Sequence, residues 1–268
     1  MRVDVLWTQA EWPAIDPQNR VAIVVDVLRS TSTIATALAN GARAILPAAS
    51  TEDALQIARS LGRDGVLLCG ERRNVRIEGF DLGNSPAEFG REVVGGRTLV
   101  MCTTNGTNAL LAASGARAVY VASFLNLGAV LEELRRDGGD PVFVCAGRSG
   151  LVGLDDVLCA GAAVARLTGH EPGKRKAKGV RRPRDPGADV ELGDGALAAQ
   201  LLWLASAPID PAVLRATGAG RQLEALGMGD DVAACAEPDV LRVVPVLENR
   251  KIVAKRGGAA GRSAGAAR

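Results

Sequence analysis

The sequence has very little histidine: among 268 residues there is one, His170, in a stretch predicted to be a loop. Hydrolysis by a Ser–His–Asp triad, a histidine-ligated zinc site and phosphohistidine chemistry therefore cannot be built around a histidine core. Any chemistry must rest on carboxylates, arginines, hydroxyls, amides and a bound ion.

Cysteine pairs and long apolar runs are also lacking. The five cysteines are scattered, without a CxxC pair, which predicts reduced and buried thiols and a cytoplasmic protein. Met1–Trp12 does not resemble a signal peptide, and the longest apolar stretch, 196–207, is too short to span a bilayer. We therefore expect no membrane partner.

Net charge of one sign is nearly absent, because 32 basic residues face 30 acidic ones. The global charge therefore points neither to nucleic acid nor to a membrane surface as a partner. A homo-oligomer remains an open alternative.

What the sequence does contain is a regular alternation of short apolar runs with Ala/Leu-rich stretches at helical spacing. This pattern predicts parallel strands covered on both faces, and hence a three-layer α/β/α fold with a largely parallel sheet. The predicted strands are 21–25, 44–46, 66–69, 98–102, 118–121 and 142–145, and the predicted helices are 33–39, 51–60, 107–113, 127–136 and 155–167.

Two of these units resemble each other. A shift of 74 places lays residues 32–45 on residues 106–119, and each copy reads as a hydroxyl-rich loop, a helix, a Gly-Ala-Arg turn and a strand. The glycine suits a left-handed helix end. We interpret the pair as two pseudo-repeated βαβ units; chance similarity of alanine-rich helices is the alternative.

Composition also predicts the domain limits. Residues 1–250 are expected to form one α/β domain, with division into two subdomains left open. A basic insert rich in Pro and Gly, 171–189, is expected to interrupt the domain as a flexible segment, and 251–268 are expected to form a flexible tail.

Hydroxyl-rich loops follow two of the predicted strands and open the next helices. In open α/β sheets ligands bind outside the carboxyl ends of strands, and a helix N-terminus attracts anions. Helix capping explains one Ser or Thr, but not a run of them beside Asp and Arg. The predicted phosphate-binding residues are Ser30, Thr31, Ser32 and Thr33 in the first loop and Thr103, Thr104, Asn105, Gly106 and Thr107 in the second.

Carboxylates and arginines stand near the same strand ends. Asp26, Glu71 and Asp81 are candidate Mg²⁺ ligands, because Mg²⁺ usually takes one or two carboxylates with water and substrate phosphate. With Arg29, these three carboxylates are the predicted catalytic residues. Further predicted substrate-binding residues are Arg72, Asn84, Ser85, Arg148 and Asp155, with Asp155 and Asp156 not separable from the sequence.

Several known phosphate motifs are missing. Residues 169–175 read G-x-x-x-G-K-R, one residue short of a P-loop and without its hydroxyl. Leu28 stands where a two-aspartate covalent phosphatase has its second aspartate. A phospho-aspartate at Asp26 stays open but is not favoured.

With these loops in place, the sequence resembles the 2-phosphosulfolactate phosphatase (ComB) family over nearly its whole length. The matching motifs are DVLRSTSTIATALANGA at 26–42, GER at 70–72, IEGFDLGNSPAEF at 77–89, TTNGTNAL at 103–110, SFLN at 123–126, CAGRSGLVGLDDVLCAGA at 145–162 and, more weakly, LGMGDDVAACAEPDVLRVVP at 226–245. The resemblance implies an α/β/α fold, Mg²⁺ dependence and hydrolysis of 2-phosphosulfolactate to sulfolactate, a step in coenzyme M biosynthesis. A related 2-phospho acid is an open alternative substrate.

Two other functions compete with this hypothesis. The same loops could bind phosphorylated metabolites without hydrolysing them. The basic insert could bind nucleic acid, although a solvated linker without aromatic residues is the simpler interpretation. Its basic side chains are Lys174, Arg175, Lys176, Lys178, Arg181, Arg182 and Arg184.

Overall fold

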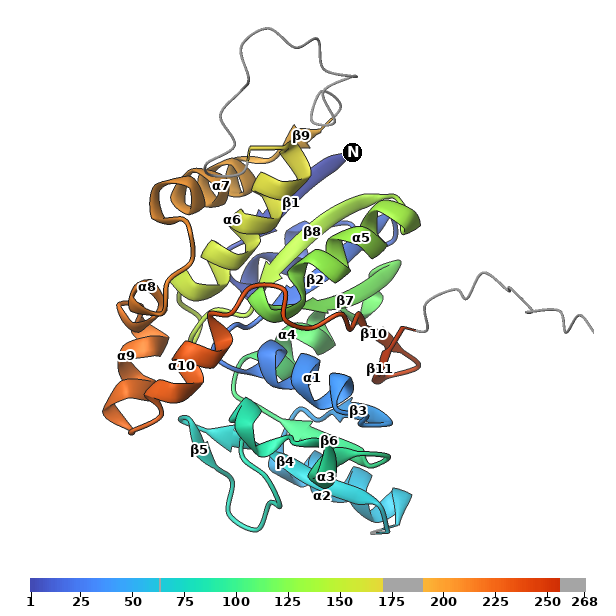
Figure 1. Cartoon of the computed structure of the whole chain (residues 1–268). Helices are drawn as coiled ribbons and strands as arrows, with labels where there is room; N and C mark the ends of the chain where they lie inside the picture. The colour runs from blue at the N-terminus through green and yellow to red at the C-terminus, as the bar shows by residue number, and fades with distance from the viewer. Residues whose placement is uncertain (63, 171–189, 256–268) are drawn as a thin grey trace, which may run out of the picture.

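The computed structural model describes residues 1–62, 64–170 and 190–255 (Figure 1). Within these residues the elements are β1 (Arg2–Leu6), the 3-10 helix η1 (Gln9–Ala14), β2 (Arg20–Val25), α1 (Ser30–Ala39), β3 (Ala44–Pro47), α2 (Thr51–Leu61), β4 (Val66–Arg72), β5 (Val75–Arg76), η2 (Pro86–Glu88), α3 (Arg91–Val94), β6 (Thr98–Cys102), α4 (Gly106–Ala112), η3 (Ala113–Gly115), β7 (Ala118–Ala122), η4 (Phe124–Asn126), α5 (Leu127–Asp137), β8 (Asp140–Cys145), α6 (Leu154–Thr168), β9 (Glu191–Leu192), α7 (Asp194–Ser206), α8 (Pro211–Arg215), α9 (Gly218–Ala225), α10 (Gly229–Cys235), β10 (Pro245–Glu248) and β11 (Lys251–Ala254).

The described strands form one sheet in the order β5-β4-β6-β3-β11-β10-β7-β2-β8-β1-β9. It contains two parallel sets, β4-β6-β3 and β7-β2-β8-β1-β9. The antiparallel hairpin β10–β11 joins the sets, with Val246 paired to Tyr120 on one side and Ile252 to Ile45 on the other. The prediction of a largely parallel sheet is confirmed.

Both faces of this sheet are covered, as the continuous apolar runs predict. Along β2, Val21, Ile23 and Val25 belong to one buried cluster, whereas Ala22 and Val24 belong to another. The first cluster includes buried residues of α5, α6 and α7, and the second includes buried residues of α1 and α4. Because successive residues of a strand point to opposite faces, this division produces three layers.

The end of the chain differs from its predicted description as a tail. Residues 251–254 form β11, in the middle of the sheet, and Ile252 is fully buried there. The predicted start of the tail at residue 251 was wrong. A four-residue strand carries little sequence signal, and the Gly/Ala/Arg-rich composition beyond Lys255 is typical of a tail. Residues 256–268, and the insert 171–189 with all its basic side chains, lie outside the described residues.

The two similar segments share an order of elements, β2-α1-β3 and β6-α4-β7. Their helix ends differ, because Gly41 has a φ of 91° whereas Gly115 ends a 3-10 turn without a positive φ. The pseudo-repeat therefore stays a prediction.

All five cysteines are buried and free of disulfides, as predicted. In the parts of the chain that the structure covers, no helix combines the length and apolarity needed to cross a bilayer.

Candidate active site

A cavity of about 430 Å³ lies where β2, β4, β6 and β8 end. This volume suits a small ligand. The helices α8, α9 and α10 gather at the same side of the molecule, on the left in Figure 1, and α9 contributes to the cavity wall. The lining residues are Asp26, Leu28, Arg29, Glu71, Arg73, Asn74, Asn84, Thr104, Asn105, Gly147, Arg148, Ser149, Gly153, Asp155, Asp156, Ala219, Gln222, Ala225 and Leu226.

Three buried aspartates belong to the acidic part of this wall, which also includes Glu71. Burial, together with repulsion from Asp155 and Glu71, raises the pKa of Asp26 to about 7. Burial also raises the pKa of Asp155 to about 6, while backbone donors and the charge of Arg148 act in the opposite direction. The pKa of Asp156 is raised by burial and by the other two aspartates. Because these carboxylates are costly to ionise together, a cation in the cavity would stabilise them.

The structure separates Asp155 from Asp156. Asp156 accepts hydrogen bonds from Val27 N at 2.8 Å and from Gly147 N at 3.0 Å, so it ties the loop after β2 to the loop after β8. Asp155 lies in the first turn of α6 and lines the cavity close enough to Arg148 for their charges to interact. Both aspartates line the cavity, but Asp156 bonds to the backbone of two loops, whereas Asp155 lies beside the backbone of Leu28 and the charge of Arg148.

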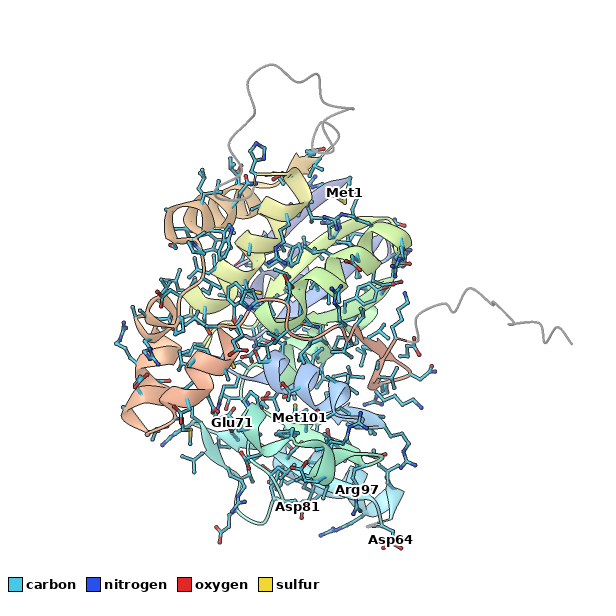
Figure 2. The ribbon with its side chains drawn as sticks, viewed as in Figure 1. Met1, Asp64, Glu71, Asp81, Arg97 and Met101 are labelled. Atoms are coloured by element: carbon cyan, nitrogen blue, oxygen red, sulfur yellow. The ribbon has the colours of Figure 1, made fainter. Side chains whose placement is uncertain are left out.

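Glu71 and Asp81 lie in different places. Glu71, at the end of β4, lines the cavity and accepts hydrogen bonds from Thr104 N at 2.8 Å and Asn74 N at 2.6 Å. Asp81 is exposed, is absent from the cavity lining, and accepts a 2.7 Å hydrogen bond from Leu68 N. Figure 2 shows Asp81 well below Glu71 in the view. The structure brings Asp26 and Glu71 to one cavity but not Asp81.

The first hydroxyl-rich loop forms the buried first turn of α1. Thr31 Oγ1 donates to Asp26 O, Ser32 Oγ to Val27 O and Thr33 Oγ1 to Asn84 O, each at 2.8 Å. These three hydroxyls therefore satisfy carbonyl groups of the polypeptide and do not line the cavity. Two of them hold the main chain of Asp26 and Asn84 in place, outside the cavity lining.

The second hydroxyl-rich loop divides in the same way. Thr103 and Thr107 bond to each other, with Thr107 Oγ1 donating to Thr103 O at 2.8 Å, whereas Thr104 and Asn105 line the cavity. A Cβ atom at Gly106 would lie 2.6 Å from Asp26 Oδ2, so glycine is required for α4 to approach Asp26 closely.

The predicted arginines also separate. Arg29 and Arg148 line the cavity, together with Arg73, which sequence reasoning did not select. Arg72 is outside the lining, and its Nη2 contacts Cys102 Sγ at 3.0 Å. Ser85 is also outside the cavity lining, and its Oγ donates a hydrogen bond to Asp231 Oδ1 at 2.5 Å.

Four buried side-chain atoms in the described part of the chain lack a hydrogen-bond partner. They are Arg29 Nε, Ser30 Oγ, Asn84 Oδ1 and Thr104 Oγ1. Three belong to residues of the cavity wall. The fourth, Ser30 Oγ, lies next to Gly106, as does the carboxylate of Asp26. Buried polar groups are normally paired, so this clustering indicates a polar ligand.

Sequence reasoning missed the contribution of α9. Ala219, Gln222, Ala225 and Leu226 reach the cavity from more than 60 residues after the last predicted site residue, Asp155. The weak motif at 226–245 touches the edge of this segment, but no spacing rule connects it to the strand loops. Asn74, Gly147, Ser149 and Gly153 were missed too, although each is close in sequence to a predicted residue.

The fold and cavity thus define an α/β/α protein whose strand-end loops are built for a small, charged ligand. A family model described as 2-phosphosulpholactate phosphatase matches residues 7–250. Proteins named "Probable 2-phosphosulfolactate phosphatase" are similar to the chain: one from Thermotoga petrophila is 38% identical over 91% of this chain and 96% of its own length. Another from Symbiobacterium thermophilum is 39% identical over 90% and 97%.

A third relative of that name, from Clostridium beijerinckii, is 32% identical over 94% of this chain and 99% of its own length. The chain belongs to the 2-phosphosulfolactate phosphatase family. The resemblance drawn from the motifs is confirmed.

Proposed function

We propose that this chain is a Mg²⁺-dependent phosphatase that hydrolyses 2-phosphosulfolactate, or a related 2-phospho acid, to the hydroxy acid and phosphate. The observation that carries the proposal is the meeting of Asp26, Glu71 and Asp155 with Arg29 and Arg148 in one small cavity. Family membership supports the same chemistry. We expect the reaction to serve coenzyme M biosynthesis in the cytoplasm.

The cavity residues fit Mg²⁺. Asp26 and Glu71 would hold the ion, because both carboxylates line the cavity and Asp26 is buried among other acids. The described residues contain no group of three or more His, Cys, Asp or Glu side chains placed to hold a metal. That arrangement is compatible with Mg²⁺, which often keeps several waters and uses one or two protein carboxylates with substrate phosphate. When bound, Mg²⁺ would neutralise charge on the phosphoryl group.

The protein groups would divide the remaining work. Asp155, with a pKa raised to about 6, is suited to orient a water and accept its proton as the water oxygen attacks phosphorus. The P–O ester bond breaks, the leaving oxygen of the hydroxy acid takes up a proton from solvent, and Asp155 releases to solvent the proton that it accepted, so one water is consumed. Arg148 would hold the second acid group of the substrate, because its guanidinium lies beside the first turn of α9 at the cavity wall.

The test is phosphate release from a panel of phosphoesters that includes 2-phosphosulfolactate and phospholactate, with Mg²⁺ and with a chelator. We expect turnover of 2-phospho acids that the chelator abolishes and Mg²⁺ restores. Binding of these esters without phosphate release would favour the non-catalytic binder. Turnover that the chelator leaves unchanged would remove Mg²⁺ from the proposal.

A further inference from the structure

Asp231 on α10 is a buried carboxylate of the weaker motif at 226–245, and it does not itself line the cavity. It is 7% exposed, and its two oxygens have different partners. Oδ2 accepts a hydrogen bond from Arg29 Nη1 at 2.6 Å, and Oδ1 accepts one from Ser85 Oγ at 2.5 Å. Asp231 therefore joins three segments that are far apart in the sequence: the start of α1, the loop before η2, and α10.

The contacts of Arg29 leave a defined part of its guanidinium free. The group has five N–H bonds. Nη1 contacts Asp231 and Met228 Sδ, the latter at 3.2 Å, and Nη2 donates to Asn74 O at 2.9 Å. Within the described residues Nε has no partner, although Arg29 is 3% exposed and lines the cavity. The N–H of Nε and one N–H of Nη2 are thus left for a ligand oxygen.

We propose that Asp231 is a positioning residue, which fixes the guanidinium of Arg29 so that its unpaired N–H edge meets an anionic oxygen of the substrate. The inference rests on the phosphatase function proposed above. An arginine held at one edge by a buried carboxylate and at the other by a carbonyl loses little further freedom when it binds an anion. Without Asp231 the same side chain would have to be ordered by the substrate itself.

A different role for Asp231 would be to fasten α10 to the body of the protein and nothing more. The two roles predict different kinetics. A fastening residue changes stability and leaves ligand affinity intact in the folded protein. A positioning residue changes affinity for anions, and the change depends on the presence of Arg29.

The decisive variant is Asp231→Asn, with Asp230→Asn as its matched control. Asp230 is the preceding residue on the same helix and is exposed, so its replacement removes the same charge without touching Arg29. In Asp231→Asn we expect KM for the 2-phospho acid to rise about 10- to 100-fold, the range of one charged hydrogen bond, with kcat changed much less. Asp230→Asn should leave both constants unchanged.

A double-mutant cycle with Arg29→Gln isolates the coupling. If Asp231 acts through Arg29, adding Asp231→Asn to Arg29→Gln should change KM by no more than about twofold. Calorimetric titration of each protein with inorganic phosphate and with sulfolactate identifies the anionic group. Weaker phosphate binding in Asp231→Asn assigns Arg29 to the phosphoryl group, and weaker sulfolactate binding assigns it to the acid end.

Three results would overturn the inference: an unchanged KM in folded Asp231→Asn, equal effects of Asp231→Asn with and without Arg29, or unchanged binding of both probes. If the wild type releases no phosphate, the proposed function fails, and the titrations still decide the role of Asp231. If Asp231→Asn does not fold, Ser85→Ala takes its place, because it removes the second hydrogen bond of Asp231 and keeps the ion pair. It should raise KM about threefold, and no change would refute the inference.

Discussion

Replacing Gly106 by alanine should damage activity far more than stability. A Cβ atom at this position would lie 2.5 Å from Ser30 Oγ and 2.6 Å from both Asp26 Oδ2 and Ser30 Cβ, whereas ordinary contacts are 3.4–4 Å. Each neighbour must therefore move by about 1 Å. Asp26, Ser30 and Gly106 are all buried, so the movement has to be shared by the N-termini of α1 and α4.

The expected magnitudes differ for the two measurements. Overpacking costs about 1–3 kcal/mol, and the gain from replacing glycine in a helix is at most about 1 kcal/mol, so unfolding should be easier by roughly 0–2 kcal/mol. Displacing a catalytic group by about 1 Å can cost on the order of 100-fold in rate. Gly106→Ala should therefore lose Mg²⁺-dependent phosphate release while keeping most of its stability.

Gly115→Ala is the matched control. Gly106 begins α4, and Gly115 lies just after the end of the same helix. Gly115 lacks a positive φ, and a Cβ atom there would meet nothing nearer than Pro17 Cγ at 3.9 Å. Its urea unfolding and its phosphate release should both match the wild type. If Gly106→Ala kept phosphate release within about threefold of the wild type, the close approach of α4 to Asp26 would have no catalytic meaning.

Three further outcomes are expected. Asp26→Asn should lower phosphate release by about 100-fold or more, because Asp26 lines the cavity. Asp81→Asn should keep phosphate release within about threefold of the wild type, because Asp81 bonds to β4 outside the cavity. Equal losses in the two variants would contradict this assignment. In a chelator, the free energy of unfolding should fall as the pH rises from about 4 to 8, because the pKa of Asp26 is raised from 3.8 to about 7 in the folded protein; Asp26 alone contributes on the order of 4 kcal/mol, and Asp26→Asn should reduce the slope of the urea-unfolding profile while leaving the part that Asp155 and Asp156 contribute. Ile252→Ala should cost about 2–5 kcal/mol because Ile252 is fully buried in β11, and exposed Lys251→Ala should cost almost nothing; similar values would disprove the central place of β11.

Local patterns predicted the strand-end loops correctly because the signals lie within a few residues of each other. The apolar run 21–25 followed by Asp26, Arg29 and hydroxyl residues predicts a buried strand that opens into a helix, and β2 and α1 have this arrangement. The same reasoning placed Glu71, Thr104 and Arg148 at strand ends, and all three line the cavity. Parallel strands make this inference possible, since their carboxyl ends lie where ligands bind.

What each polar side chain faces was decided by the tertiary structure. Thr31 and Thr33 look like phosphate donors in the sequence, but their hydroxyls bond to carbonyl groups behind the cavity. Asp81 belongs to a specific motif, yet the loop folds back so that it caps Leu68 N. A carboxylate or hydroxyl can serve a backbone group as readily as a ligand, and sequence spacing does not distinguish the two.

The sequence by itself determined the three-layer fold, the family and the strand ends that carry the site, because periodicity and motifs are local properties of the chain. Only the tertiary structure showed that α9 contributes to the cavity wall, that Asp231 bonds to Arg29 from 202 residues away, and that Asp156 ties two loops together at the cavity. These roles depend on which segments meet in space, and that meeting is fixed by packing across the whole sheet.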